Sequence, residues 1–444
     1  MKWQAYPKYR NSGIKWLGDI PEHWQADRLR WTVLGCKNGT WGKEPDGVDD
    51  ITCIRVADFD RIKFRVIMAR PTVRAIGLSE RRQRLLQNRD LLLEKSGGGE
   101  LHSVGTVVLY DHYEPAVCSN FIARMPVAQG FDPSFLTYLH AHLYSARVNI
   151  RSIKQTTGIQ NLDSFSYLDE VTAYPLLDEQ RAIAAFLDRE TEYIDLLVEK
   201  KRRQIELLQE KRVVLISLAV TKGLNPNVKM KATGVEWIGE IPKHWDILPL
   251  FAPMRECDRR NKGNTEENVL SLSYGQIKRR DVSDNFGLLP ESFETYQIVE
   301  RENIILRLTD LQNDQVSLRV GLAKERGIIT SAYVCLEAGR SLEATYVYYL
   351  LHTYDISKVF YAFGGGVRQS MKFADLKWLP IVVPEKLEQR AIADFLDRET
   401  ARIDALVEKI RTSISLLREY RSALITAAVT GKIDVRRDRN GSRT

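Results

Sequence analysis

The chain has few cysteines and no apolar run long enough to cross a membrane. Five cysteines occur among its 444 residues, namely Cys36, Cys53, Cys118, Cys257 and Cys335. They form no C-x-x-C pair and follow no regular spacing, which argues against a disulfide framework or structural zinc and for reduced thiols in the cytoplasm. Without a run of about 18 apolar residues we expect no transmembrane helix. The first residues also lack the apolar core of a secretory signal.

Motifs of catalysis are also missing. Gly39–Lys43 has the wrong spacing for a phosphate loop, and no G-x-G-x-x-G follows an expected strand. Asp132–Phe135 (DPSF) lacks the second proline of an amino-methyltransferase loop and fits a helix cap instead. His140 and His142 are two residues apart, so on a helix they point in different directions and make a poor metal site. We therefore expect a chain that is no enzyme and binds no metal or cofactor itself.

The composition is that of a globular protein with a basic balance. Hydrophobic residues make up 44% of the chain, charged residues 28%, and the formal net charge is +7. A chain of this length suggests two to four domains. The positive charge permits a nucleic-acid partner without requiring one.

One stretch of the chain occurs twice. Glu179–Lys200 returns as Glu388–Lys409 at an offset of 209 residues, with 18 of 22 positions identical. Gly13–Trp24 (GIKWLGDIPEHW) likewise recurs as Gly234–Trp245 (GVEWIGEIPKHW), with seven of 12 positions identical. The stretches between these borders do not align by eye. This order predicts a duplicated protein with two different inserts.

The repeats divide the chain into four predicted parts. Residues 1–176 hold an arm, a border and the first insert, and residues 177–223 form a central helical region. Residues 224–385 hold the second border and insert, and residues 386–444 form a C-terminal helical region with a basic tail. In both borders the tryptophans are expected to act as packing anchors and the histidine before the last tryptophan to make structural hydrogen bonds.

Both inserts mix expected strands with expected helices, so we predict two α+β domains. Apolar runs rich in β-branched residues predict strands at Ile51–Val56, Leu91–Leu93, Thr106–Tyr110, Asn268–Ser273 and Asn303–Leu308. An Asp-Pro cap predicts a helix over Phe135–Leu143, and Ser341–Leu351 also fits a helix. Thr156–Asn161 and Gly364–Ser370 are expected to be loops.

The helical repeats are the clearest structural prediction. A short helix over Asp178–Leu187 and a junction at Asp188–Thr191 are expected to precede a long helix of about 30 residues, about 45 Å in length. Its apolar residues recur every three or four positions. So narrow a stripe on so long a helix needs a partner, and the second copy is the obvious one. We predict an antiparallel coiled coil between two insert domains related by pseudo-two-fold symmetry.

Two glycine-rich loops, Lys95–Gly99 and Gly364–Gln369, are candidates for contact with DNA. Glycine lets the backbone approach a phosphate or base edge closely, and Arg, Lys, Gln and Asn side chains read such groups. A single residue of these types on a surface is more often simply solvated. The residues predicted to bind DNA are Arg55, Lys95, Ser96, Gly97, Gly98, Lys154, Thr157, Gln160, Asn161, Tyr274, Arg307, Gly365, Arg368 and Gln369.

In this arrangement the chain resembles the specificity (S) subunits of type I DNA restriction-modification systems. The resemblance covers nearly the whole chain. It rests on two E-Q-R-A-I-A-x-F-L-D segments preceded by Pro175 and Pro384, on the long helices after them, and on the G-x-x-W-x-G-x-I-P-x-H-W borders. It implies that each insert is a target recognition domain reading one half of a bipartite, asymmetric DNA sequence, and that the paired helices set the unread spacer.

The resemblance also implies partners. Two modification (M) subunits would dock on the helices, carry S-adenosylmethionine and methylate adenine, while restriction (R) subunits would carry ATP and magnesium. The residues assigned to M-subunit docking or to the helix pair are Gln180, Arg181, Phe186, Leu187, Gln389, Arg390, Phe395 and Leu396. The chain itself would be a non-catalytic, cytoplasmic subunit that binds double-stranded DNA.

Two alternatives stay open. A coiled-coil interaction scaffold whose inserts bind protein would show no salt-dependent affinity for DNA. A specificity domain detached from a single-chain restriction-methylation enzyme would be half of this arrangement, whereas the chain carries the border, insert and helix twice.

Overall fold

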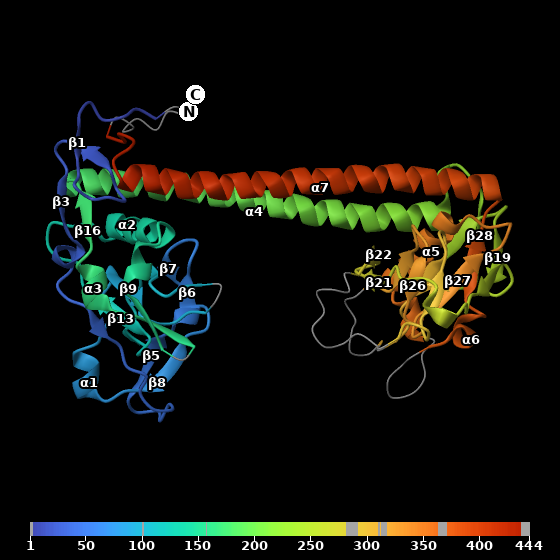
Figure 1. Cartoon of the computed structure of the whole chain (residues 1–444), viewed down its shortest axis with the longest axis horizontal. Coiled ribbons are helices and arrows are strands. Elements are labelled where there is room, and N and C mark those ends of the chain that lie inside the picture. The colour runs from blue at the N-terminus through green and yellow to red at the C-terminus, as the bar shows by residue number, and fades with distance from the viewer. Residues whose placement is uncertain are drawn as a thin grey trace. The chain divides into compact units, whose positions relative to one another are not determined.

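The computed structural model describes residues 3–99, 102–156, 158–280, 292–309, 311, 318–362 and 371–436. The chain divides into two compact units, unit 1 with residues 1–200 and 412–444, and unit 2 with residues 201–411. Helix α4 (Leu177–Lys222) and helix α7 (Lys386–Val429) each contribute one segment to both units (Figure 1). The predicted division into four parts, with each helical region separate, stays a prediction.

Unit 1 is built on a six-stranded sheet in the order β4-β13-β9-β11-β7-β6. Its strands are β4 (Lys37–Asn38), β6 (Phe59–Asp60), β7 (Arg65–Val66), β9 (Asp90–Glu94), β11 (Val107–Tyr110) and β13 (Ile122–Met125). All five residues of β9 are buried, which explains its continuous apolar run. Helix α2 (Pro133–Ser145) packs against β9 and β11, as Figure 1 shows.

Smaller sheets complete unit 1. Three strands run in the order β12-β5-β8 and three in the order β10-β15-β14, while β16 pairs with β3 and β1 with β2. Their bounds are β1 (Tyr9–Asn11), β2 (Asp19–Pro21), β3 (Gln25–Arg28), β5 (Asp50–Ile54), β8 (Thr72–Ala75), β10 (Ser96–Gly97), β12 (Ala116–Cys118), β14 (Ile153–Thr156), β15 (Ile159–Leu162) and β16 (Val171–Tyr174). Short helices are α1 (Leu78–Arg82), α3 (Ser164–Leu168), η1 (Leu29–Thr32), η2 (Val56–Asp58) and η3 (Val148–Ser152).

Unit 2 has a four-stranded sheet in the order β20-β27-β24-β25, and its other strands form pairs. The sheet strands are β20 (Met254–Glu256), β24 (Ile304–Leu306), β25 (Val320–Leu322) and β27 (Val334–Ala338). The pairs are β17 (Met230–Ala232) with β18 (Glu240–Pro242), β19 (Asp246–Pro249) with β28 (Pro380–Val383), β21 (Leu270–Ser273) with β22 (Gln276–Arg279), and β23 (Gln297–Val299) with β26 (Gly327–Ile329). The helices are α5 (Ala344–Ile356), α6 (Phe373–Leu376), η4 (Lys262–Asn264) and η5 (Val359–Ala362).

Most expected elements of the inserts are confirmed. The five predicted strands correspond to β5, β9, β11, β21 and β24, and the two predicted helices to α2 and α5. The Asp132 side chain accepts hydrogen bonds from the backbone N–H groups of Ser134 and Phe135, as a helix cap should. The predicted loop at Thr156–Asn161 is wrong, because this stretch belongs to the β14–β15 hairpin. Gly364–Ser370 lies outside the described residues.

The predicted break in the first helical repeat is also wrong. Helix α4 continues without interruption through Asp188–Thr191. Two of these residues contact the insert rather than ending the helix, since Asp188 Oδ1 accepts a 2.8 Å hydrogen bond from the hydroxyl of Tyr138 on α2, and Thr191 Oγ1 lies 3.3 Å from the same hydroxyl. A helix of 46 residues replaces the expected short and long pair, and the α+β class of the protein is confirmed.

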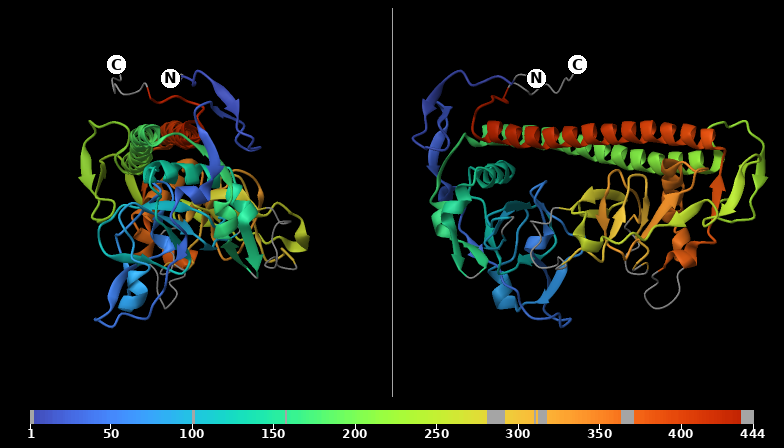
Figure 2. Two further views of the ribbon diagram at one scale, coloured as in Figure 1. Left: turned by 90° about the vertical axis from the view of Figure 1, so that its left-hand side faces the viewer. Right: turned by 45° about the vertical axis from the view of Figure 1, so that its right-hand side comes forward.

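In each unit a segment of α4 lies beside a segment of α7 and runs in the opposite direction. In unit 1 Asp195 Oδ1 lies 3.0 Å from Arg421 Nε, and the start of α4 shares a hydrophobic core with the end of α7 (Figures 1 and 2). In unit 2 the equivalent ion pair joins Arg212 Nη2 and Asp404 Oδ2 at 3.8 Å. Each core therefore needs side chains from both helices. Within the described ranges, no helix is long and apolar enough to span a membrane.

A glycine that ends α7 lets the first border close over the helix. Gly431 has a φ of 68°, and a Cβ at this position would overlap the ring of Pro21. Gly223 follows α4 with a φ of 76°, and its Cβ would lie 3.1 Å from the Trp245 ring. Both glycines combine a left-handed backbone with a close approach of the border.

Replacing Gly431 by alanine is expected to destabilise unit 1 more than the left-handed backbone alone explains. Gly13→Ala is the matched control, because Gly13 has a φ of 73° with nothing near its Cβ position. The control should cost about 1 kcal/mol of unfolding free energy, and Gly431→Ala roughly 1–3 kcal/mol more. Urea unfolding followed by circular dichroism measures both, and equal losses would contradict the packing argument.

Candidate nucleic-acid interface

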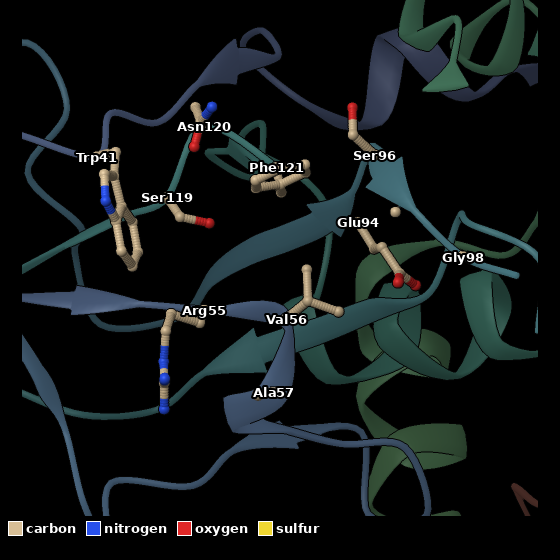
Figure 3. A pocket seen from close by; sticks show the side chains of 11 residues that line it. Trp41, Arg55, Val56, Ala57, Glu94, Ser96, Gly98, Ser119, Asn120 and Phe121 are labelled. Carbon is tan, nitrogen blue, oxygen red and sulfur yellow. The ribbon is translucent and has the colours of Figure 1, made fainter. Parts of the chain in front are cut away.

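Four of the residues predicted to bind DNA come together in unit 1. Arg55, Ser96, Gly97 and Gly98 line one cavity of about 440 Å³, a size within the range of ligand pockets. The other lining residues are Trp41, Val56, Ala57, Glu94, Ser119, Asn120 and Phe121. Figure 3 shows Trp41 and Ser119 on one side of this cavity and Glu94 and Ser96 on the other.

The glycine-rich loop is placed by strand pairing. Ser96 and Gly97 form β10, which pairs with Asn161 and Gln160 of β15. Gly97 and Gly98 have φ angles of 121° and 66°, which residues with a side chain rarely adopt. A Cβ on Gly98 would also lie 2.9 Å from the Gln160 side chain. The glycines are therefore required by the fold as well as available to a ligand.

Glu94 is a buried carboxylate at the cavity. Its residue is 1% exposed, and its Oε1 lies 2.7 Å from Arg61 Nη2. Its Oε2 is buried and makes no hydrogen bond among the described residues. A buried acceptor without a partner is unusual.

Aromatic side chains stand at the same cavity. Trp41 is 36% exposed and Phe121 43% exposed. The guanidinium of Arg74 lies 4.2 Å from the centre of the Trp41 ring and pairs with Glu44. This cation–π contact holds the indole in place. The flat face of Trp41 therefore lines one side of the cavity, and Glu94 lines the other.

The remaining predicted residues of the first insert make internal contacts. Lys95 Nζ donates to Asn38 Oδ1 at 2.9 Å and Lys154 Nζ to Asp163 Oδ2 at 2.8 Å. Gln160 Oε1 accepts from the backbone of Val104, and Ser96 Oγ donates to Asn161. The guanidinium of Arg55 points away from the cavity in Figure 3 and donates to Asp58. Thr157 lies outside the described residues.

In unit 2 the structure describes two of the predicted residues. Tyr274 is 80% exposed and lies in the turn between β21 and β22. Arg307 is partly exposed, and its backbone pairs with that of Arg319. The other three predicted residues, Gly365, Arg368 and Gln369, lie outside the described residues.

The repeated borders clamp the helix ends of their own units. Trp24 Nε1 donates to Glu179 Oε1 at 3.0 Å, and His23 Nε2 lies 2.8 Å from the second carboxylate oxygen. In unit 2 Trp245 and His244 contact Glu388, each at 2.9 Å. We call these two sets of three residues the Trp–Glu clasps. The expected structural role of the border histidines is confirmed.

The residues assigned to docking are mostly used inside the units. Gln180 and Gln389 are buried, and each accepts a hydrogen bond from the residue that caps the neighbouring helix, Asp132 or Glu343. Phe186, Leu187 and Leu396 lie in the hydrophobic cores, with Phe395 packed partly buried against one of them. As packed, these side chains are closed to a partner, whereas Arg181 and Arg390 are exposed.

An exposed apolar set on the helices was not predicted. Large apolar residues at least one-third exposed are found on both helices, namely Tyr193, Leu196, Leu207, Val213, Val214, Leu218, Leu387, Leu406, Leu416 and Tyr420. The sequence contains these residues, but most of them lie outside the narrow apolar stripe that predicts the contact between the two helices.

Burial shifts the pKa values of several histidines and cysteines. It lowers the pKa values of His140, His142 and His352 to about 4, so all three are neutral at pH 7. It raises the pKa of Cys53 to about 11 and that of Cys118 to about 12, which keeps both thiols protonated. Across the described part of the chain, no group of three His, Cys, Asp or Glu residues could hold a metal ion.

The chain was compared with known proteins. No protein-family model matches it. A curated relative, the putative type I restriction enzyme MjaX specificity subunit of Methanocaldococcus jannaschii, is 22% identical over 431 residues, which are 95% of this chain and 96% of the relative. A solved chain from a study of complex assembly and conformational transition of the type I R-M system is 16% identical with a TM-score of 0.66, covering 93% of this chain and 99% of its own length.

A second solved structure has the same fold. The HsdS subunit from Thermoanaerobacter tengcongensis is 15% identical with a TM-score of 0.54, and the match covers 93% of this chain and 98% of that subunit. Both structural matches therefore extend over both units and both helices.

Removing the clasp carboxylate should destabilise unit 2. Glu388→Ala leaves the buried N–H of Trp245 without an acceptor, so we expect a loss of roughly 2 kcal/mol of unfolding free energy, and a smaller loss for Glu388→Gln. Glu408 is the matched control, because it makes an exposed ion pair with Arg411 on the same helix. Glu408→Ala should change stability by less than about 0.5 kcal/mol. Equal urea midpoints for the two alanine variants would contradict the assigned role.

Proposed function

Because the resemblance to type I specificity subunits is confirmed over nearly the whole chain, we propose that this protein is the DNA-reading subunit of such a system. The repetition of three contacts carries the proposal. The Trp–Glu clasp and the hydrogen bond from a helix cap to a buried glutamine occur in both units. The Tyr138–Asp188 hydrogen bond of unit 1 likewise has a counterpart in unit 2, between Tyr349 and Asp397 at 2.7 Å. The same framework thus presents two inserts of different sequence.

Each unit would read one half of a bipartite, asymmetric target. In unit 1 the cavity next to Gly97 offers a buried carboxylate acceptor and two aromatic side chains, groups that suit the amino edge and the ring plane of a base. In unit 2 the exposed Tyr274 would meet the other half-site. Since the two inserts differ, the two half-sites would differ as well.

The helices would set the unread spacer. Helix α4 has 46 residues, about 69 Å at 1.5 Å per residue, and it begins in one unit and ends in the other. We infer that the two segments of each helix form one antiparallel coiled coil that relates the units by a pseudo-two-fold axis. Its length would then fix how many base pairs separate the half-sites.

Two modification subunits would dock on this chain. The exposed apolar side chains of α4 and α7, such as Leu207 and Leu416, would supply the contact area together with Arg181 and Arg390. S-adenosylmethionine would be bound by the modification subunits, and ATP and magnesium by restriction subunits. This chain would be a non-catalytic subunit that acts on DNA in the cytoplasm.

The decisive experiment is methylation mapping. The chain is co-expressed with its candidate modification subunit, and methylated adenines on the host DNA are mapped by long-read sequencing. We expect a split motif of two short defined halves with a fixed gap. Exchanging residues 25–176 for another insert should change one half only, and a change in the other half would overturn the assignment. A scaffold that binds only protein would give no methylation and no salt-dependent DNA affinity.

Lengthening both helices together should lengthen the gap. Seven residues are inserted in α4 after Lys200 and seven in α7 after Arg411, where the two units divide. The helices then grow by about 10.5 Å, which corresponds to about three base pairs at 3.4 Å each. The control carries the same seven residues after Gly47, an exposed turn residue with nothing near its Cβ position. An unchanged gap in the helix variant would contradict the proposal that the length of the helices sets the spacer between the half-sites.

A further inference from the structure

The turn between β21 and β22 holds a tyrosine in a conformation that tyrosine rarely adopts. Ser273 pairs with Gln276, so Tyr274 and Gly275 form a two-residue hairpin turn (Figure 1). Their φ angles are 48° and 73°, the positive values that a type I′ turn requires at both central positions. Asn, Asp or Gly usually occupies the first of these positions, and a bulky residue there is an outlier.

Packing of the tyrosine does not explain this conformation. The Tyr274 side chain is 80% exposed, so the ring gains little from burial that would offset the strained backbone. Strain that persists without a packing gain is typical of positions kept for a function. An exposed aromatic ring on such a backbone is therefore a candidate contact for a ligand.

The hairpin beneath the tyrosine is firmly anchored. Gly275 is buried, and a Cβ there would lie 3.1 Å from Leu318. Gly321 of β25 lies under the hairpin, since its Cβ would be 2.6 Å from Leu272 and 2.9 Å from Ile277. Glycine at these two places lets the hairpin sit directly on the sheet. The ring is therefore presented on a rigid support rather than on a loose loop.

Exposed basic residues follow the turn in β22 and directly after it. Gln276, Lys278, Arg279 and Arg280 are all exposed, and Arg279 Nε lies 2.9 Å from Glu325 Oε1. Proteins that bind single-stranded or kinked DNA combine an aromatic ring with nearby cations, because bases stack on the ring and phosphates are attracted to the cations. An apolar protein partner would not require these cations.

We propose that Tyr274 is a wedge that stacks on a base pair inside the half-site read by unit 2 and opens the step beside it. The inference rests on the proposed function, which supplies the duplex. The left-handed turn aims the ring outward, and the anchored hairpin prevents it from folding back when DNA approaches. A wedge of this kind opens a base step at an energetic cost that depends on the sequence, and so contributes to specificity.

The test uses the assembled complex with its modification subunits and a duplex that carries the mapped target. Tyr274→Asn removes the ring but suits the left-handed turn, so its thermal unfolding midpoint should equal or exceed that of the wild type. Its affinity for the target should fall roughly 10- to 100-fold, while its affinity for non-specific DNA stays unchanged. Tyr274→Phe keeps the ring and should bind within about threefold of the wild type.

Fluorescence locates the wedge. 2-Aminopurine is placed at successive positions of the unit 2 half-site, and one position should brighten with the wild type and Tyr274→Phe but stay dark with Tyr274→Asn. Wild-type affinity of Tyr274→Asn for the target overturns the wedge, and so does its failure to assemble with modification subunits, which would make the ring a protein contact. A wild-type complex that methylates no split motif would instead contradict the proposed function.

Discussion

One buried hydrogen bond in each unit holds the rest of the architecture together. Trp24 is 1% exposed and Trp245 0%, and the indole N–H of each is accepted by a carboxylate near the start of the helix that follows the insert of the same unit. This bond joins the border to the helix that follows the insert. The whole insert between these two residues is thereby closed into a loop with a fixed base. A buried donor paired with a charged acceptor is among the stronger polar contacts in proteins.

This closure explains how two inserts of unlike sequence can share one framework. The contacts that position α2 and α5 on the helices come from repeated residues, the buried glutamines and the Tyr–Asp pairs. The surface away from the helices takes no part in them. Sequence can therefore change there with little effect on stability, and the two units carry different groups at that surface, a cavity with a buried Glu94 in one and an exposed Tyr274 in the other.

The repeated borders and helical segments could be recognised from the sequence alone, because two similar stretches can be matched without knowing the conformation that they adopt. The strands of the inserts were also found, since buried strands such as β9 are continuous apolar runs. The helix through Asp188–Thr191 was missed because its polar residues are bound by the insert, a contact that local patterns do not reveal. The β14–β15 hairpin was missed for the opposite reason, as its exposed polar residues show little apolar alternation. The glycine-rich composition pointed to Gly97 and Gly98, which line the cavity, whereas Glu94, which lines it as well, lies in a buried strand and gave no such signal.

The two units differ in the number of chain segments that form them. Unit 2 is one continuous segment, residues 201–411, whereas unit 1 needs residues 412–444 as well. Leu424, Ile425, Ala428 and Val429 fill the core of unit 1, so during synthesis the first insert emerges with a gap in its core while the second can already close. The first insert thus completes its core after the second, and its apolar surface stays open to chaperones or to another copy until residues 412–444 have been made. A frameshift near residue 412 would therefore damage the core around the first insert, although that insert lies in the N-terminal half of the chain.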